Sequence, residues 1–391
     1  LEARERDEFG AMDGITLIAG HATIVGPRSV RVRAADGVRR LLTRDIVVAT
    51  GGRPRSLDIP GLGDRALTNE SLFELEQPPG HLVIVGAGAV GLEMADAFAR
   101  LGSRVTIVEA ADRPLAVAGD AAAAAIAAAL ARRGIALRTG STVTGFDGAT
   151  RTLRLSGPRG EGMLGDVDRV LVAVGRVPAT RGLGLERVGV LPAPEGIPVD
   201  AWGRTGAEGV WAVGDVTPGS HQTHAANAMG RRIVRRIALP LLPALGGPPP
   251  IPSAVFTDPE VAWIGPREQA LARRIHPDAT TTIGIGLPDT DRGLTDGVAI
   301  GFVEITAVRL TGRILAATAV GPTASETITT IALAMRRRIS LHGLRGLVVP
   351  YPTFSGAITA IADEFARRTL PALPREAGRY ARHRLARPPR P

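Results

Sequence analysis

The sequence predicts an α/β protein with doubly wound parallel sheets, followed by a smaller α+β region. Three observations support this prediction. Residues 81–109 contain a strand, a glycine turn, a helix and a second strand in succession. Further apolar runs end in glycine turns at 49–54, 173–178 and 210–216. A proline-rich linker at 240–252 then precedes a region where strands are followed by helices, as in α+β folds.

The stretch 81–109 has the pattern of a dinucleotide-binding βαβ unit. Its first strand, 82–85, is apolar and rich in branched side chains, which is typical of a parallel strand buried on both faces. In the following GAGAVG turn, Gly86 permits the tight turn, Gly88 the approach of a pyrophosphate, and Gly91 the close packing of helix on strand. The free N–H groups of the next helix favour an anion, so we expect Ala89 and Val90 to line the same site.

The helix and the second strand complete this unit. Four apolar side chains recur at helical spacing, and Gly102 is placed to end the helix; they are Val90, Met94, Phe98 and Leu101. Glu109 ends the strand at 105–108. A carboxylate about twenty residues past the glycine turn accepts ribose hydroxyls and repels the phosphate that distinguishes NADP. The sequence therefore predicts NAD as cofactor, with NADH preferred. The alternative is an ordinary glycine turn, because GxGxxG spacings arise by chance among 48 glycines.

Composition narrows the class of protein. At 391 residues and 45% hydrophobic content, the chain can form two to four domains. It has no cysteine, which excludes disulfides, thiolate chemistry and Cys-based metal sites within this chain. The apolar stretch 237–256 is broken by prolines, so we expect no membrane span and a cytoplasmic location. All 47 basic residues are arginine and aromatics are only 3%, so a net charge of +9 does not indicate a nucleic-acid partner.

The N-terminal region has strand-like runs at 15–18, 30–33 and 45–49, separated by Gly-Pro and Asp-Gly turns. The chain begins at Leu1 in mid-pattern, and residues 1–48 contain no complete βαβ unit, which needs about 30 residues or more. We therefore expect a missing N-terminal piece.

Three further motifs, in order around the fingerprint, give the chain a family likeness: ATGGRP at 49–54, AVGRVP at 173–178 and VWAVGDV at 210–216. Their order resembles the pyridine nucleotide–disulfide oxidoreductases, flavoproteins that include dihydrolipoyl dehydrogenase, glutathione reductase and mercuric reductase. The resemblance implies FAD/NAD(P)-binding doubly wound (Rossmann-like) domains plus a C-terminal α+β dimerisation domain. It implies domain bounds of 1–76 and 181–250 for two FAD-domain segments, 77–180 for the inserted NAD domain, and 251–391 for dimerisation with a basic tail.

The resemblance also implies the cofactor sites, FAD and NAD. The turns would contribute Thr50 and Gly51, Gly175, and Gly214 with Asp215, and Glu93 would lie beside the nicotinamide. Asp215 would contact the ribityl and phosphate region of FAD, although an acid after such a turn can instead cap the next helix. Residues 221–230 resemble the helix whose N-terminus faces the flavin, with Thr223, His224 and Ala225 at its start. His221 and His224 share a helical face, but no acid or cysteine nearby supports a metal site.

The region after the linker matches the opening of the family's dimerisation domain at VFTDPE, residues 255–260. Strands are expected at 298–305 and 314–320, and a helix at 324–335. The resemblance implies a homodimer. The arginine-rich end, 367–391, has a broken pattern and is predicted to be a solvated tail.

Two family features are absent from this sequence. The first is the N-terminal FAD fingerprint with its CxxxxC disulfide. The second is the His-Glu pair of the HPTxxE motif, which is replaced by Tyr351 and Gly356 in YPTFSG. A phenol with a pKa of about 10 and no orienting acid is a poor base at neutral pH, which argues against dithiol turnover. Tyr351 is the one candidate catalytic residue. Tyrosine at this position resembles the mercuric-reductase-like members, but their C-terminal cysteine pair is also absent.

The sequence therefore predicts an FAD-dependent oxidoreductase that takes hydride from NAD(P)H, with NADH preferred, and passes electrons to an unknown acceptor. That acceptor would be a small molecule, a small thiol or a metal ion, by resemblance to mercuric reductase or dihydrolipoyl dehydrogenase. The alternative is a truncated, non-catalytic remnant that binds nucleotide without flavin chemistry.

Overall fold

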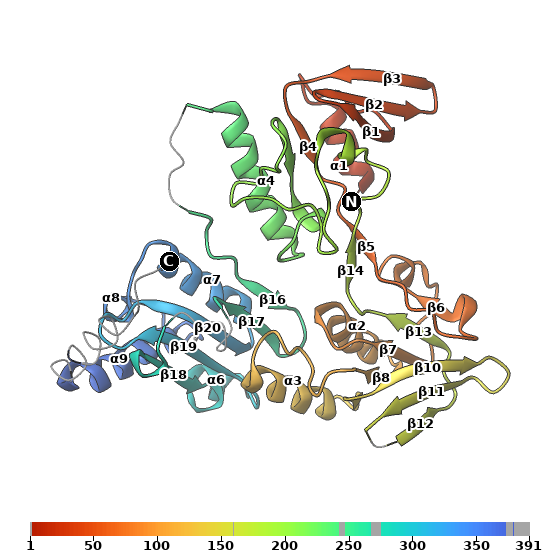
Figure 1. Ribbon diagram of the computed structural model, residues 1–391. Coiled ribbons are helices and arrows are strands. Elements are labelled where there is room, and N and C mark those ends of the chain that lie inside the picture. The colour runs from red at the N-terminus through yellow and green to blue at the C-terminus, as the bar shows by residue number, and fades with distance from the viewer. Residues whose placement is uncertain (1, 159, 242–246, 267–274, 373–377, 379–391) are drawn as a thin grey trace. The chain divides into compact units, whose positions relative to one another are not determined.

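The computed structural model describes residues 2–158, 160–241, 247–266, 275–372 and 378 (Figure 1). The chain folds into two compact units, each assembled from two stretches of sequence. The first unit comprises residues 1–53 and 176–248, and the second comprises 54–175 and 249–391. In the described residues, no helix is both long and apolar enough to cross a membrane.

The second unit contains a five-stranded parallel sheet in the order β6-β13-β7-β8-β9. Its strands and two helices are β6 (Ala66–Leu67), β7 (His81–Val85), α2 (Ala89–Arg100), β8 (Arg104–Val108), α3 (Asp120–Arg132), β9 (Ala136–Arg138) and β13 (Arg169–Val172). The central strand β7 is buried along its whole length. Its alternate side chains enter two different cores, because successive residues of a strand face opposite sides of the sheet.

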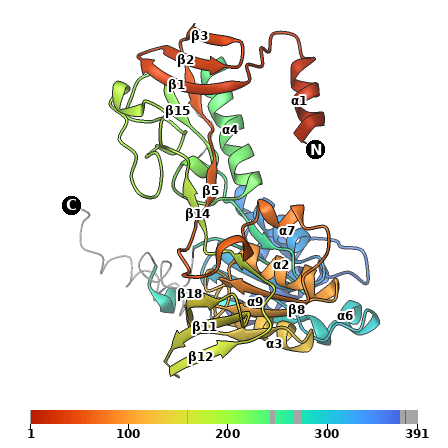
Figure 2. The same cartoon turned by 90° about the vertical axis from the view of Figure 1, so that its right-hand side faces the viewer.

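One face of this sheet is covered by helices and the other by strands. Leu82 and Ile84 share a core with side chains of α2 and α3. Val83 and Val85 share the other core with Phe146 and neighbouring residues of an antiparallel sheet. That sheet comprises β10 (Thr142–Asp147), β11 (Thr152–Gly157) and β12 (Gly160–Leu164), which are labelled in Figure 1; β11 and β12 are also labelled in Figure 2. The predicted apolar run therefore forms a strand buried on both faces.

The C-terminal part of the second unit is an antiparallel sheet in the order β16-β17-β20-β19-β18 with helices packed on it. The strands are β16 (Ser253–Val255), β17 (Glu260–Ile264), β18 (Thr280–Gly286), β19 (Phe302–Val308) and β20 (Ile314–Gly321). The helices are α6 (Asp291–Thr295), α7 (Ala324–Arg336), α8 (Leu341–Leu344) and α9 (Gly356–Thr369). Both strands and helices contribute fully buried side chains to the core of this sheet domain, for example Ile305, Ile331 and Phe365.

The described residues of the first unit form three small sheets. An antiparallel sheet comprises β1 (Gly20–Gly26), β2 (Ser29–Ala34) and β3 (Gly37–Leu42), and β4 (Ile46–Val48) pairs in parallel with β15 (Val210–Ala212). The third sheet joins β5 (Gly52–Pro54) to β14 (Arg176–Pro178). The helices of this unit are α1 (Glu2–Gly10) and α4 (Thr223–Ala238). Its core includes Ile24, Val48, Leu185 and Ile197.

Several elements differ from the sequence prediction. The prediction of a strand at 15–18 was wrong, because β1 begins at Gly20 and the side chains of Ile15 and Leu17 are exposed. An apolar run that finds no pairing strand gains nothing from an extended conformation, whereas residues 20–26 pair with β2. The strand expected at 298–305 lies at 302–308 as β19. Most of the predicted tail, 373–377 and 379–391, lies outside the described residues.

The buried face of α2 also differs from the predicted one. Val90 and Leu101 are 40% and 63% exposed, while Leu92 and Ala95 are fully buried beside Phe98. Gly91 contacts the strand closely, and Ala95 and Phe98, four and seven residues further along, lie on the same side of the helix. Gly102, with φ +93°, follows the helix end as predicted.

Candidate nucleotide- and acceptor-binding sites

The glycine turn after β7 has the geometry of a phosphate cradle. Gly86 has φ +108°, and a Cβ there would lie 2.6 Å from the Ala173 carbonyl oxygen. A Cβ at Gly91 would lie only 2.0 Å from the carbonyl oxygen of Gly86, so glycine is required for α2 to approach the strand. Gly88 is the N-cap of α2 and faces open space, with no side chain capping the helix. These features fit a pyrophosphate at the helix N-terminus, near Ala89 and Val90.

Glu109 lies against this turn, although it is 23 positions after Gly86 in the sequence. Its Oε2 accepts a hydrogen bond from the Ala87 N–H at 2.6 Å, and its Oε1 accepts one from the Ala111 N–H at 2.8 Å. The strand end therefore brings the acid and the glycine turn together. Arg113, the nearest arginine in the sequence, forms an ion pair with Asp120. In this arrangement Arg113 is engaged with a carboxylate of the α3 N-terminus.

Glu93 connects α2 to the C-terminal sheet domain. Its Oε1 accepts a hydrogen bond from the backbone N–H of Phe256 at 3.0 Å, one residue beyond the end of β16. The contact holds one oxygen of the Glu93 carboxylate near the start of α2. The family resemblance implies that the nicotinamide ring would bind beside this carboxylate. No pattern in the sequence pointed to Phe256 as its partner, because the two residues are 163 positions apart.

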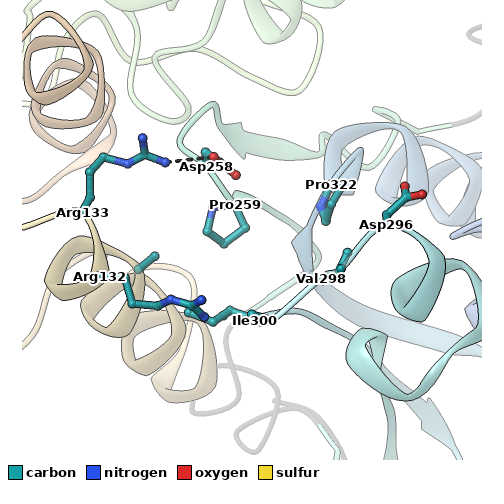
Figure 3. Close-up of a pocket in the computed structure, with 11 residues that line it drawn as sticks. Arg132, Arg133, Asp258, Pro259, Asp296, Val298, Ile300 and Pro322 are labelled. Carbon is teal, nitrogen blue, oxygen red and sulfur yellow. Dashed lines mark hydrogen bonds and ion pairs between the residues drawn. The ribbon is translucent and has the colours of Figure 1, made fainter.

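A second polar contact between the same domains lies at the other end of α2. Buried Asp96 forms ion pairs with Arg100 and Arg133, and both arginines also contact Asp258. Beside this cluster is a cavity of about 590 Å³, shown in Figure 3. It is lined by Ala129, Arg132, Arg133, Asp258, Pro259, Asp296, Gly297, Val298, Ala299, Ile300 and Pro322. None of the predicted site residues lines this cavity.

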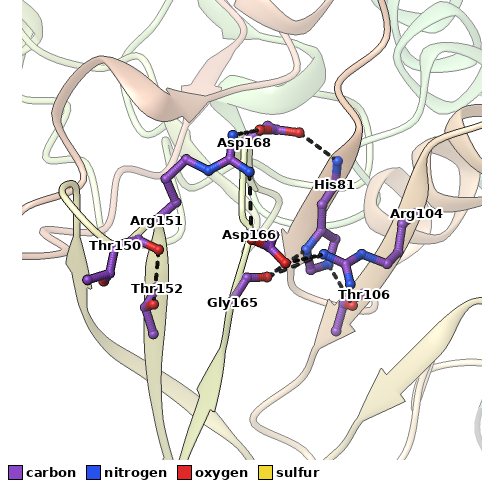
Figure 4. Close-up of polar contacts among 9 residues, drawn as sticks. All are labelled: His81, Arg104, Thr106, Thr150, Arg151, Thr152, Gly165, Asp166 and Asp168. Carbon is purple, nitrogen blue, oxygen red and sulfur yellow. Dashed lines mark hydrogen bonds and ion pairs between the residues drawn. The ribbon is translucent and has the colours of Figure 1, made fainter.

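At the opposite end of β7 from the glycine turn, His81 is almost fully buried within a polar cluster (Figure 4). Its Nδ1 lies 3.2 Å from the Gly165 carbonyl oxygen and its Nε2 lies 3.0 Å from the Thr106 hydroxyl. Its backbone N–H donates to Asp168, which also pairs with Arg151. Burial, and secondarily the charge of Arg104, lowers the pKa of His81. The cluster joins β7, β8 and the turn before β13, so its role is structural.

In the first unit, the predicted flavin turns lie near one another. Gly51, with φ +68°, follows Thr50, whose hydroxyl donates to the Ala179 carbonyl oxygen at 2.8 Å. Gly214 has φ +75° and precedes Asp215, whose carboxylate lies 2.9 Å from Nε of Arg176. Asp215 does not cap the next helix, because α4 begins only at Thr223 with Gln222 as its N-cap. The helix-capping alternative for Asp215 was therefore wrong.

Arg176 is the residue that sequence reasoning missed in this unit. Its Nη2 donates to the Gly52 carbonyl oxygen at 2.5 Å, and its Nε is paired with Asp215. One guanidinium thus connects two of the glycine turns. The signal was available in the AVGRVP motif, where this arginine directly follows Gly175. Gly175 itself has φ +109°, and its carbonyl oxygen accepts a hydrogen bond from the Arg55 N–H at 3.0 Å.

The N-terminus of α4 carries the remaining flavin-site predictions. Thr223 and His224 are exposed, Ala225 is half-buried, and the N-cap Gln222 makes no side-chain capping bond. An uncapped start of a 16-residue helix leaves N–H groups and a positive dipole end available to an anionic group. With Asp215 and Arg176, these residues fit the flavin end of an FAD site. Among the described residues, no group of three or more His, Asp or Glu side chains is arranged to hold a metal.

The YPTFSG motif lies in the C-terminal sheet domain, and its structure corrects one expectation. Tyr351 does have an orienting acid: its hydroxyl donates to Asp291 Oδ2 at 2.8 Å. Asp291 begins α6, 60 residues earlier, so the sequence motif could not reveal it. The hydrogen bond and the negative charge of Asp291 raise the pKa of Tyr351. Because its phenolate forms less readily, Tyr351 is even less available as a base at neutral pH than predicted. Gly356 begins α9 and supplies no side chain.

Comparison with known proteins establishes the family. The family model for the pyridine nucleotide-disulphide oxidoreductases matches residues 5–230, and the model for the dimerisation domain of the same family matches 251–362. The chain belongs to this family. Its members bind FAD and NAD(P)H, and the chain is an NAD(P)H-dependent flavoprotein oxidoreductase of the disulfide-reductase type. The non-catalytic alternative is not favoured.

Individual relatives have several different names. Dihydrolipoyl dehydrogenase 3 of Pseudomonas aeruginosa is 33% identical over 362 residues, covering 90% of this chain and 76% of that protein. An NAD(P)H dehydrogenase (quinone) of Mycobacterium tuberculosis is 34% identical over 376 residues, covering 91% and 72%. A mercuric reductase of Acidithiobacillus ferrooxidans is 34% identical over 380 residues, covering 94% and 66%. The flavoprotein disulfide reductase RclA of Escherichia coli superposes with a TM-score of 0.82 at 26% identity, covering 92% and 82%.

Proposed function

We propose that this flavoprotein takes hydride from NADH and delivers the electrons to a small planar acceptor of the quinone class. FAD, when bound, accepts the hydride and passes electrons onward. The chain's own residues bind and orient the two ligands: the glycine turn and Glu109 would hold the nucleotide, and Asp215, Arg176 and the start of α4 would hold the flavin. The observation that carries the proposal is the Tyr351–Asp291 hydrogen bond at the YPTFSG motif.

The proposal depends on what each acceptor demands of the protein. Oxidation of a dithiol needs a base that takes the thiol proton, and such catalysis is worth about 10²–10⁴-fold. Tyr351, whose pKa is raised, is unsuited to that task. A quinone instead gains electrons, and water can supply the protons to its oxygens, so no protein base is required. A 34% identical relative bears the name NAD(P)H dehydrogenase (quinone), which supports the same choice.

A pair of rates on the FAD-loaded protein tests this proposal. We expect rapid NADH oxidation with 1,4-naphthoquinone and slow NAD reduction with dihydrolipoamide. In a protein that also carries the family's redox disulfide, Tyr351→His combined with Gly356→Glu restores the motif's acid–base pair and should raise the dithiol rate. The matched control is Tyr351→Phe with Gly356→Gln, which changes the same positions without a base. Robust dihydrolipoamide turnover in the unmodified protein, or none with naphthoquinone, would overturn the assignment.

The preference for NADH is a proposal based on Glu109. Its carboxylate lies beside the glycine turn, where a phosphate on the adenosine ribose would be repelled. Titration of both reduced nucleotides by fluorescence quenching measures this preference. Glu109→Gln retains the size of the side chain but removes its charge. It should therefore reduce the difference in binding affinity between NADH and NADPH. Equal or tighter binding of NADPH by the unmodified protein would contradict the assignment.

We also propose that the chain forms a homodimer through residues 251–362, which match the dimerisation-domain model. Several large apolar side chains of this region are exposed in the single chain, including Leu294 at 68% and Val348 at 92%. Such side chains are typical of surfaces that become buried on association. Light scattering should give twice the monomer mass of 40.7 kDa. A monomer at micromolar concentration would contradict the proposal.

A further inference from the structure

Two adjacent residues of α6 hold the Tyr351 loop. Asp291 accepts the hydrogen bond from the Tyr351 hydroxyl at 2.8 Å, and the guanidinium of Arg292 lies 5.6 Å from the centre of the Phe354 ring. Arg292 is in turn held by Asp296 at 2.8 Å, one helical turn further on. The side chain of Thr290 caps α6 by accepting from the Gly293 N–H. The short helix is therefore anchored at both Tyr351 and Phe354.

In the single chain, the Tyr351 ring is fixed by its hydroxyl and is 81% exposed. A phenol whose hydroxyl donates a hydrogen bond to a carboxylate keeps two properties for binding: a flat face and an electron-rich ring. Because an aromatic face carries negative charge density, it stacks favourably on an electron-poor planar ring. The same hydrogen bond removes the phenol from proton transfer, since Asp291 opposes a second negative charge beside it.

We propose that Asp291 positions the Tyr351 ring as an aromatic platform on which a planar, electron-poor acceptor stacks. This inference rests on the quinone function proposed above and names the residues that would recognise the quinone. Tyr351 would touch the acceptor, and Asp291 would act through Tyr351 as a positioning residue. The carboxylate that orients the motif's aromatic side chain thus comes from α6 instead of from position 356.

The first test needs neither flavin nor turnover. The chain has two tyrosines, Tyr351 and Tyr380, so Tyr380→Phe leaves Tyr351 as the only source of tyrosinate absorbance. In that background, Asp291→Asn should make tyrosinate appear at lower pH. The matched control is Asp289→Asn, which removes an equal charge two residues away. An Asp291→Asn titration that coincides with the control would show that Asp291 does not hold Tyr351 and would overturn the proposal.

The second test separates acceptor binding from flavin reduction. With the FAD-loaded protein, Tyr351→Ala should raise the KM for 1,4-naphthoquinone by about two- to tenfold, the range typical of one aromatic stacking contact. Tyr351→Phe and Asp291→Ala should raise this KM less, because each variant keeps an aromatic ring at position 351 and loses only the hydrogen bond that orients the ring. Anaerobic flavin reduction by NADH should keep its rate in all three variants.

The outcomes of this second test are distinguishable. Naphthoquinone turnover with an unchanged KM in Tyr351→Ala would overturn the platform while leaving the quinone function standing. Absence of naphthoquinone turnover in the unmodified protein would overturn both. A KM that rises in Tyr351→Ala and is largely restored in Tyr351→Phe supports the platform, because only the ring is common to the native protein and the phenylalanine variant.

Discussion

Among the described residues, the parallel sheets that contain β7 and β4 differ in how fully their strands are buried. All five residues of β7 in the second unit are buried, and strands pair with β7 on both sides. In the described part of the first unit, β4 pairs with β15, and Val47 at its centre is 43% exposed. Both strands lead to glycine turns assigned to cofactors. Parallel strands are stable when both faces are covered, so we expect the strand before the proposed nucleotide-binding turn to be more stable than the strand before the proposed flavin-binding turn.

The largest effect should come from truncating equivalent apolar residues in the two sheets. Ile84→Ala leaves a cavity in a fully buried strand and should cost about 2–5 kcal/mol of unfolding free energy. Val47→Ala removes a half-exposed side chain and should cost less than about 1 kcal/mol. Hydrogen exchange of peptides spanning 82–85 and 46–48 measures local opening in each sheet. Equal destabilisation by both substitutions would mean that β4 is covered as fully as β7.

The next effect concerns the turn at the end of β7. Gly91→Ala places a Cβ 2.0 Å from the Gly86 carbonyl oxygen, so helix and strand must separate, at a cost of about 1–3 kcal/mol. Gly88→Ala is the matched control, because its Cβ meets open space and should leave stability unchanged while weakening nucleotide binding. Thermal unfolding and NADH titration of both variants distinguish the two roles. Identical melting temperatures would contradict the packing role of Gly91.

A smaller, pH-dependent effect is expected at the other end of β7. The pKa of His81 is lowered from 6.5 by burial, so the folded state binds its proton less tightly than the unfolded state does. Its contribution to stability is therefore fully present above pH 6.5 and is lost as pH falls below that value. Urea unfolding at a series of pH values should show a shallower acid decline in His81→Asn than in the unmodified protein. The matched control is His276→Asn, which removes an exposed histidine elsewhere in the chain.

The smallest effect on stability is expected in the first unit. Asp215→Asn weakens a partly buried ion pair with Arg176 while keeping a polar side chain there, and should cost about 1 kcal/mol or less. Its effect on FAD retention should be larger, because the same carboxylate is assigned to the flavin. Visible absorbance after gel filtration measures bound FAD, and Asp200→Asn is a control elsewhere in the same unit. Full FAD retention by Asp215→Asn would remove this residue from the proposed site.

Local patterns were sufficient to predict the βαβ unit of residues 81–109. The branched apolar run, the three glycines and the acid at the strand end all lie within one βαβ unit, and their contacts follow from the geometry of that unit. Prediction was weaker where a residue's environment depends on a distant segment. The prediction of which face of α2 is buried was wrong at Val90 and Leu101, because helical spacing alone allows more than one apolar stripe. Ile15 was assigned to a strand because propensity does not reveal whether a partner strand exists.

By itself, the sequence determined the family, the cofactor classes and the positions of the glycine turns, because short-range spacing fixes backbone conformation in such motifs. Only the tertiary structure revealed the partners of the carboxylates predicted to be functional and of Tyr351. Glu93 accepts from Phe256, Asp215 pairs with Arg176, and Asp291 holds Tyr351. Each of these pairs joins residues at least 39 positions apart, the separation of Asp215 and Arg176. Side-chain contacts over such separations arise from how sheets and helices pack, which no local pattern encodes.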